Sequence, residues 1–305
     1  MKRNDRSTGR GGPAGAPALG YVMIAPTAVL LCALILVPVG YSVCLALFRW
    51  QLTEIDLTKP FTGLDNFTHL FHDGQLRTAL SHTALYVVGC VAAELLLGFV
   101  VVVALFDLTR GRKLTHSIVL LPMIIAPVVT SLLWRYLLDP QFGIVSQVMS
   151  VFGHDSGIDW FGSPRLALPS LMMVDVWQWT PFVILILHAG MLAIPEERFE
   201  AARVDGAGRW KVLRHVVIPA LGPQLLLILL FRTMDTYRIF DTVFVLTKGG
   251  PGTSTNTLGL YTYRTGFSFF DMGYAMALSV FILVTIAVIS AFYLRLLRTR
   301  DEVAA

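Results

Sequence analysis

The chain reads Glu200-Ala201-Ala202-Arg203-Val204-Asp205-Gly206-Ala207 between its fourth and fifth apolar stretches, and Val216-Val217-Ile218-Pro219 soon after. Alanine is a strong helix former with almost no side chain, so another surface can approach Ala201 and Ala202 closely. Asp205-Gly206 is a turn signal, because glycine adopts left-handed backbone angles that a bulkier residue resists. This short polar segment therefore predicts a helix followed by a tight turn, held between apolar runs.

The flanks of this segment extend the prediction to a helix, a turn and a second helix. Pro195 suits the first turn of a helix, and glutamates follow near its N-terminus, where negative charge is favoured. A second short helix, over about 208–217, carries apolar residues at helical spacing, namely Trp210, Leu213 and Val217. Spacing alone leaves two interpretations open: a surface that docks on another protein, or an ordinary loop whose amphipathic helix rests on lipid headgroups.

The composition is that of a membrane protein. Of the 305 residues, 55% are hydrophobic and only 14% are charged, and the mean hydropathy is +0.67. Water-soluble domains carry about 25% charged residues to cover their surface, so the shortfall fits a surface that faces lipid. The three cysteines, Cys32, Cys44 and Cys90, are scattered through apolar runs, which argues against a disulfide framework and a metal site.

Six apolar stretches are long enough to cross a bilayer, which takes about 20 helical residues. They cover about 19–48, 79–106, 115–138, 167–193, 221–246 and 272–297. Backbone groups in lipid must satisfy one another, so these runs are expected to be helices, and their hydrophobicity does not alternate as in a transmembrane barrel. We therefore predict an all-α membrane protein with a flexible basic tail at 1–18, a six-span domain at 19–298 and a second tail at 299–305.

Positive charge is distributed unevenly between the predicted loops. With the N-terminus placed in the cytoplasm, the inside segments hold about twice as many Lys and Arg residues as the outside segments. Cytoplasmic loops carry the excess of positive charge in membrane proteins. The chain is therefore expected to have both termini in the cytoplasm and the segment around Glu200 on the cytoplasmic face.

Four stretches carry a family resemblance. Glu200-Ala201-Ala202, Gly206 and then Val216-x-Ile218-Pro219 match the EAA motif of the permease subunits of bacterial ATP-binding-cassette importers, in which isoleucine and then leucine are more usual before the proline. The other three are similar to the sugar-type branch, with its maltose and glycerol-phosphate permeases: Gly63-Leu64-Asp65-Asn66-Phe67, Trp177-Gln178-Trp179-Thr180-Pro181-Phe182, and Phe240 to Pro251, which ends in Gly249-Gly250-Pro251. The resemblance covers about residues 19–298.

The resemblance implies a type I importer permease fold, in which six transmembrane helices carry a cytoplasmic coupling helix that rests in a cleft of an ATPase subunit. The residues that would carry the coupling here are Glu200, Ala201, Ala202, Asp205, Gly206, Ala207, Val216, Ile218 and Pro219. Closure of two ATPase subunits on ATP would turn two permease subunits from inward-facing to outward-facing. The chain has no G-x-x-x-x-G-K-[ST] loop, so ATP and Mg²⁺ are expected on the partner ATPase and no cofactor on this chain.

The implied setting is the plasma (inner) membrane of a bacterium, which the chain crosses several times. The implied partners are a second permease subunit in a heterodimer, two cytoplasmic ATPase subunits, a substrate-binding protein outside the membrane, and lipid. The net charge of +4 is explained by cytoplasmic flanks, so nucleic acid is not an expected partner.

The fifth predicted span contains Arg232, Asp235, Arg238 and Asp241, each three residues from the next. Ionisable residues inside a bilayer are costly and usually face the interior of a bundle, and opposite charges at this spacing can pair along one helix. Three interpretations stay open: a structural ladder of ion pairs, a pathway in which these groups bond sugar hydroxyls, and a contact with the second permease subunit.

Aromatic and polar residues accompany these charges and suit the apolar face and hydroxyl edge of a sugar ring. The candidate pathway residues are Asp175, Trp177, Gln178, Arg232, Asp235, Tyr237, Arg238 and Asp241. Trp177 and Trp179 are equally typical of interfacial positions in membrane helices. Glu94, in the second span, is isolated in the sequence, and whether it is buried, protonated or paired stays open.

The leading hypothesis is the permease subunit of an ATP-driven importer, forming half of the pathway for a di- or oligosaccharide such as trehalose or maltose. Glycerol phosphate and polyols are alternative solutes. From other classes, a passive channel and an integral membrane enzyme with a polar site at Asp175, Arg232 and Asp235 remain. No HExxH, GxGxxG, CxxC or nucleophile-elbow motif is present, which speaks against metal binding and nucleophilic catalysis.

Overall fold

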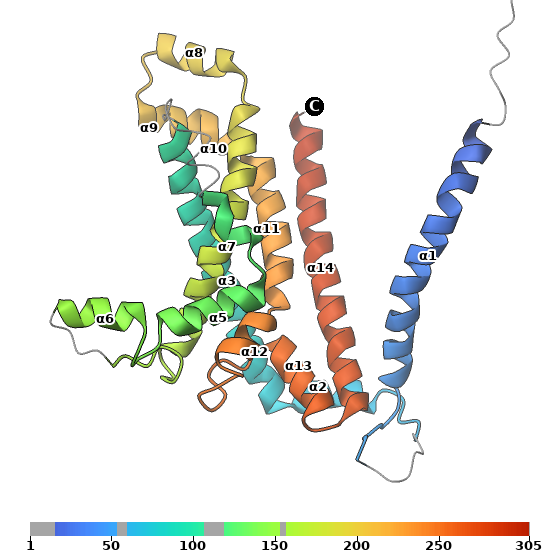
Figure 1. The fold of residues 1–305 in the computed structure, drawn as a ribbon. Helices are drawn as coiled ribbons and strands as arrows, with labels where there is room; N and C mark the ends of the chain where they lie inside the picture. Colours follow the sequence, from blue (N-terminus) through green and yellow to red (C-terminus); the bar gives the residue numbers. More distant parts are fainter. Residues whose placement is uncertain (1–15, 54–59, 107–118, 153–156, 305) are drawn as a thin grey trace, which may run out of the picture.

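The computed structural model describes residues 16–53, 60–106, 119–152 and 157–304, and this part of the chain is built from helices (Figure 1). Four of the described helices are long and apolar enough to cross a membrane. They are α1 (Ala16–Leu45), α3 (Gly74–Phe106), α7 (Ala167–Leu192) and α14 (Met272–Ala304). A fifth crossing is added if the bent pair Arg209–Ala220 and Gly222–Tyr237 counts as one span.

The remaining helices are shorter and lie at the two ends of the bundle or complete its interior. They are α2 (Asp65–His72), α5 (Pro127–Leu137), α6 (Ile144–Val151), α8 (Glu196–Val204), α9 (Arg209–Val212), the π-helix η1 (Leu213–Val217), α10 (Ile218–Ala220), α11 (Gly222–Tyr237), α12 (Asp241–Leu246) and α13 (Leu258–Phe267). Two isolated β-bridges, Phe48 with Phe61 and Gln51 with Asp271, are the only extended pairings within the described residues.

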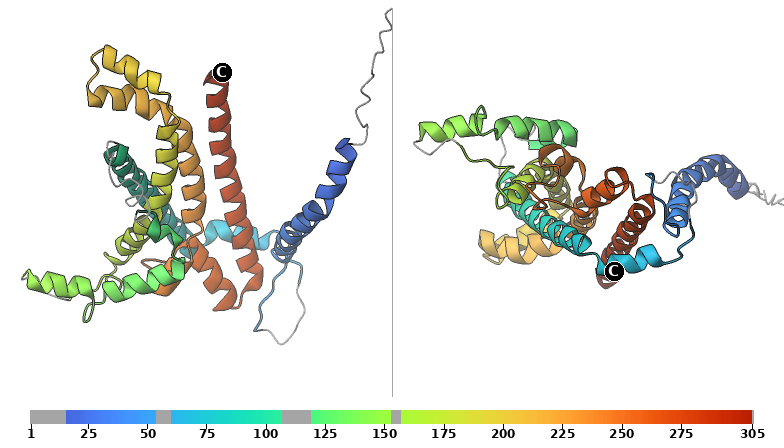
Figure 2. Two further views of the ribbon diagram at one scale, coloured as in Figure 1. Left: turned by 45° about the horizontal axis from the view of Figure 1, so that its top comes forward. Right: turned by 90° about the horizontal axis from the view of Figure 1, so that it is seen from below.

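The four long helices match four of the predicted spans within a few residues, but the predicted tails differ. Helix α1 begins at Ala16, inside the predicted tail 1–18, because Pro17 suits a first helical turn; residues 1–15 lie outside the described part. Helix α14 continues to Ala304, through most of the predicted tail 299–305, because that stretch contains no glycine or proline to end it. The start of α1, the end of α14 and helix α8 lie at one end of the molecule (Figures 1 and 2).

The predicted third span, 115–138, is not one continuous helix. Residues 115–118 lie outside the described part, residues 119–124 are helical, and α5 begins afresh at Pro127. Ala126 is extended, with ψ 139°, because the proline ring disfavours helical angles in the residue before it. The described residues therefore do not show a single helix that crosses the membrane here.

The predicted fifth span, 221–246, is divided into α11 and α12 by a tertiary contact that no glycine or proline signals in the sequence. At the break, the carbonyl of Ile239 accepts a hydrogen bond from the Thr257 hydroxyl at 3.3 Å. Gly259 lets the backbone of α13 approach, since a Cβ there would lie 2.9 Å from the Ile239 carbonyl oxygen. Packing against α13 thus overrides the helical propensity of the stretch.

Helix α1 diverges from the bundle along most of its length and approaches α14 near its C-terminal end (Figures 1 and 2). Only 6% of its apolar window is buried, against 50% for α7. Its C-terminal end is tied to α2, because the Asn66 side-chain amide donates to the carbonyls of Ala46 (2.8 Å) and Phe48 (3.1 Å). Gly273 is required at the same junction, since a Cβ there would lie 2.3 Å from the Phe48 carbonyl oxygen.

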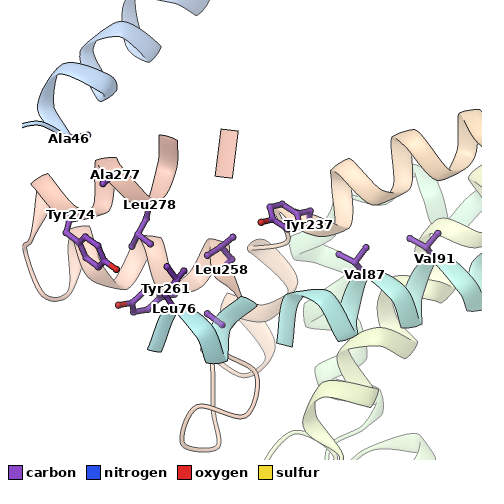
Figure 3. Packing of buried hydrophobic residues seen from close by; sticks show 11 residues of the cluster. Ala46, Leu76, Val87, Val91, Tyr237, Leu258, Tyr261, Tyr274, Ala277 and Leu278 are labelled. Carbon is purple, nitrogen blue, oxygen red and sulfur yellow. The ribbon is translucent and has the colours of Figure 1, made fainter. Parts of the chain in front are cut away.

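A buried cluster joins α3, α13 and α14 at the end of the molecule away from α8, as Figure 3 shows. Leu76, Leu258 and Leu278 are all at most 3% exposed in this cluster. Burial of this kind contributes about 25 cal/mol for each Å² of apolar surface removed from water, and tight packing contributes between helices in lipid. The cluster fixes the outer ends of these helices against one another.

Asp73 completes this junction with hydrogen bonds to its carboxylate. Tyr261 and Tyr274 donate their hydroxyls at 2.5 and 2.6 Å, and the backbone N–H of Gln75 donates at 2.8 Å. Burial by itself would raise the pKa of Asp73, but the hydrogen bonds outweigh it and lower the pKa below the usual 3.8. The ionised carboxylate therefore links the start of α3 to α13 and α14.

Candidate functional site

Residues 195–219 form an exposed helical hairpin at the end of the molecule where α1 begins and α14 ends (Figure 1). Its first arm, α8, starts after Pro195, and Glu196 and Glu197 lie in its first turn. Glu200 and Ala201 are exposed, and Ala202 is half-buried. The small side chains are therefore accessible from outside the bundle, as the sequence predicts.

The turn after α8 is a Schellman motif built on Gly206. The N–H of Gly206 donates to the carbonyl of Arg203 at 3.0 Å, and the N–H of Ala207 donates to the carbonyl of Ala202 at 2.9 Å. Gly206 has a φ of +67°, which lies in the left-handed region, and Asp205 is the C-cap. Open space surrounds Gly206, so its backbone angle, rather than crowding, requires glycine here.

The second arm of the hairpin leads into the bundle. Val216 lies in η1, and Pro219 follows in α10; a proline lacks the N–H that a regular helix needs, which fits the π-helical stretch just before it. Val217 is 3% exposed and packs in a core cluster with Met191 of α7, whereas Ile218 is 40% exposed. The arm then bends by 60° into α11. The predicted single helix over 208–217 is thus α9 followed by η1.

A buried ion network joins three helices in the interior of the bundle. Arg232 of α11 donates from Nε and Nη2 to the two carboxylate oxygens of Glu94 in α3, at 2.6 and 2.7 Å. The same guanidinium donates to Asp175 of α7 at 2.7 Å and to Asp235 at 2.9 Å. Arg238 donates to Asp235 at 3.3 Å, so two of the three pairs that the spacing allows form. The third, Arg238 with Asp241, is absent among the described residues, because the helix breaks between them.

Burial separates this network into an inner and an outer part. Glu94, Asp175 and Arg232 are at most 2% exposed, whereas the side chains of Asp235 and Arg238 are 37% and 69% exposed. A forked, hydrogen-bonded arginine is what allows buried carboxylates to stay inside a bundle, since each unpaired charge there is costly. The isolated Glu94 of the sequence is therefore a paired residue.

The exposed part of the network lines a pocket of about 330 Å³. Trp179 contributes a wall and covers Arg232, whose guanidinium carbon lies 5.0 Å from the centre of the indole ring. Besides Arg232 and Trp179, the pocket is lined by Phe182, Phe231, Met234, Asp235, Arg238 and Ile286. Aromatic faces beside charged hydrogen-bonding groups can hold a molecule with an apolar face and a polar edge.

Four other candidate pathway residues lie elsewhere. Trp177 meets Trp134 edge to face, with ring centres 5.6 Å apart, beside a second and mostly apolar pocket. Gln178 is buried, and its amide donates to the carbonyl of Ile125 at 2.8 Å, at the break before α5. Tyr237 is 8% exposed in the cluster of Figure 3. Asp241 is exposed and begins α12, with no ion pair among the described residues. The 330 Å³ pocket thus brings together Arg232, Asp235 and Arg238, with Asp175 behind them.

The sequence does not predict the partner of Glu94 or most of the residues that line the 330 Å³ pocket. Glu94 and Arg232 are 138 positions apart, and Asp175 and Arg232 are 57 positions apart, so no local pattern connects them. Phe182 and Phe231 read as ordinary apolar residues of a span, although their rings meet edge to face at 6.4 Å. The one available signal was charge: a lone glutamate inside one span calls for a positively charged partner, and the fifth span contains arginines.

A bundle of helices apolar enough to cross a membrane, a pocket with charged and aromatic walls, and an exposed hairpin at one end are features expected of a membrane transport subunit. Comparisons identify the family. Residues 95–300 match the family model described as binding-protein-dependent transport system inner membrane component. This chain belongs to that family of ABC transporter permeases, which are transport proteins rather than enzymes.

Two of the sequence relatives are permeases of trehalose or trehalose/maltose transport systems. The trehalose/maltose transport system permease protein MalF of Thermococcus litoralis is 31% identical, over 93% of this chain and 95% of that protein. The trehalose transport system permease protein SugA of Mycobacterium tuberculosis is 34% identical, over 91% of this chain and 88% of that protein. The fold is also that of a subunit in the crystal structure of a bacterial ABC transporter that imports the acidic polysaccharide alginate, with a TM-score of 0.79, 23% identity and coverage of 93% and 96% of the two chains.

Proposed function

We propose that this chain is the permease subunit of an ATP-driven importer and forms half of the translocation pathway for a di- or oligosaccharide such as trehalose or maltose. The names of the relatives support this solute class. The pocket supports it too, because a sugar ring presents an apolar face to aromatic rings such as Trp179 and hydroxyls to groups such as Asp235 and Arg238. Glycerol phosphate or a polyol is the second candidate, since the same polar groups would bond their hydroxyls.

The observation that carries the coupling proposal is the exposed hairpin with its left-handed Gly206 in a chain of this family. We infer that α8 is the coupling helix and rests on a cytoplasmic ATPase subunit, which binds ATP and Mg²⁺. The accessible Ala201 gives the ATPase a surface without bulky side chains, and Gly206 sets the angle at which this surface is presented. Val216, Ile218 and Pro219 then lead the motion into α11.

The proposed orientation places the hairpin and both chain termini in the cytoplasm. The start of α1, the end of α14 and the hairpin share one end of the bundle (Figure 1). The hairpin carries Arg198, Arg203, Arg209, Lys211 and Arg214, and cytoplasmic segments carry the excess of positive charge in membrane proteins. We infer six crossings in the membrane, the third running through 119–137 and the fifth through 221–246, which holds α11 and α12. A second permease subunit, two ATPase subunits and an external binding protein complete the proposed importer.

Substitution of Gly206 tests the proposal. Gly206→Val should leave the complex assembled but reduce both trehalose uptake and the ATPase activity that the loaded binding protein stimulates by about tenfold, because valine resists a φ of +67°. The matched control is Gly208→Ala, whose φ is −65° and which also has open space around it; it should retain both activities. Normal uptake and ATPase activity in Gly206→Val would show that coupling does not pass through this turn.

A further inference from the structure

The hairpin and the ion network both connect helices α7 and α11. The hairpin connects the end of α7 to the start of α11, and the network joins these helices again through Asp175 and Arg232. Asp175 lies about 25 Å along α7 from the hairpin, at 1.5 Å of rise per residue. Helices α7 and α11 are thus tied at two distant points, one exposed and one buried.

The third helix in the network, α3, already packs closely on α7. A Cβ on Gly98 would lie 2.5 Å from Cγ1 of Val183, and one on Gly89 would lie 3.0 Å from Sδ of Met172. Glycines at these two positions let the backbones approach, as in other tight pairs of membrane helices. Helix α11 packs on this pair through Leu221 and Ile228, and Arg232 adds the polar contact that joins all three helices.

We propose that Arg232, Glu94 and Asp175 form a clamp that makes α3, α7 and α11 move as one body when the hairpin moves, and that holds Asp235 in place on the pocket wall. Four donor bonds from a single guanidinium fix its orientation toward three helical positions. Arg232 is in this view a positioning residue. The proposal rests on the proposed function only where it concerns motion of the hairpin.

The test uses the assembled importer in lipid nanodiscs, with spin labels at the exposed Leu96 of α3 and Leu227 of α11 and with serine at the exposed Cys32 and Cys44. With the clamp intact, the distance distribution between the labels should be narrow and the same with and without ATP. Glu94→Gln, which leaves Arg232 paired with Asp175 and Asp235, should broaden it. Arg232→Lys, which keeps the charge but loses the fork, should do the same.

A second measurement separates positioning from mere stability. Trehalose imported per ATP hydrolysed should fall about tenfold in Glu94→Gln, compared with the unmodified chain in samples matched for the amount of assembled complex. Arg77→Gln, an exposed position on the same helix, is the control and should change neither the label distances nor the trehalose imported per ATP hydrolysed. If Arg232→Lys fails to assemble, Glu94→Gln decides the question alone.

The proposal is overturned if Glu94→Gln keeps a narrow distance distribution in both nucleotide states and imports as much trehalose per ATP as the unmodified chain. Failure of the proposed function gives a different result. In that case the unmodified complex imports no sugar on addition of ATP, yet the label distances without nucleotide still report whether Glu94 ties α3 to α11.

Discussion

The hairpin at 195–219 and the buried clamp differ in almost every physical respect. The hairpin is exposed, is made by neighbours in sequence, and depends on one backbone angle at Gly206. The clamp is at most 2% exposed, is made by Glu94, Asp175 and Arg232 from three helices, and depends on side-chain charge. A surface that binds and releases a partner can contribute little to the free energy of unfolding. A contact that holds three helices together is expected to contribute much more.

The largest expected effect distinguishes the two regions by stability. Glu94→Ala leaves part of a buried arginine unpaired, so it should lower the free energy of unfolding by about 3–5 kcal/mol. Glu200→Ala, on the exposed face of α8, should change it by less than about 0.5 kcal/mol. Thermal unfolding of the purified chain in detergent measures both. Equal losses of unfolding free energy in the two variants would contradict the view that the clamp stabilises the fold more than the hairpin does.

A smaller loss of stability is expected when another long-range contact, the hydrogen bond from Tyr261 to Asp73, is removed. Tyr261→Phe removes one hydroxyl donor from Asp73 and should cost about 1–2 kcal/mol of stability. The folded pKa of Asp73 is depressed, so the ionised carboxylate stabilises the fold above pH 3.8, and this contribution is lost as the pH falls through the folded pKa. The difference between Tyr261→Phe and the unmodified chain should therefore be constant near neutral pH and shrink below 3.8. A difference that grows on acidification would contradict this assignment.

The smallest effect concerns the solute rather than the fold. Asp235→Asn alters a polar group on the wall of the 330 Å³ pocket and should raise the KM for trehalose uptake by about tenfold. Trp177→Phe lies beside the other, apolar pocket with Trp134 and should leave KM unchanged. Uptake kinetics at several trehalose concentrations measure both. A larger change of KM in Trp177→Phe than in Asp235→Asn would indicate that the solute binds in the other, apolar pocket.

The sequence predicts what local patterns encode. Apolar length locates α1, α3, α7 and α14, and the Asp205-Gly206 pair locates the turn of the hairpin. The spacing of Arg232, Asp235 and Arg238 predicts their pairing along α11. The Gly206 turn can be predicted because its hydrogen bonds join residues at most five positions apart.

Long-range contacts account for what the sequence does not predict. The break after Tyr237 depends on the approach of Gly259 and Thr257 to the carbonyl of Ile239, and neither residue marks a helix end by itself. The partner of Glu94 is 138 positions away, and several arginines could have served. Side chains such as Gln178, which read as pathway groups, instead satisfy a carbonyl at a helix break.

The most direct test of the central claim, that energy enters through the cytoplasmic hairpin, is site-directed cross-linking at the exposed Ala201. The chain should carry Ala201→Cys with serine at Cys32 and Cys44. The account predicts that a membrane-impermeant maleimide leaves this cysteine unlabelled in intact cells, and that a short bifunctional maleimide joins it to the ATPase subunit in inverted membrane vesicles. Labelling from outside the intact cell, or sugar uptake that persists in the absence of any ATPase subunit, would contradict it.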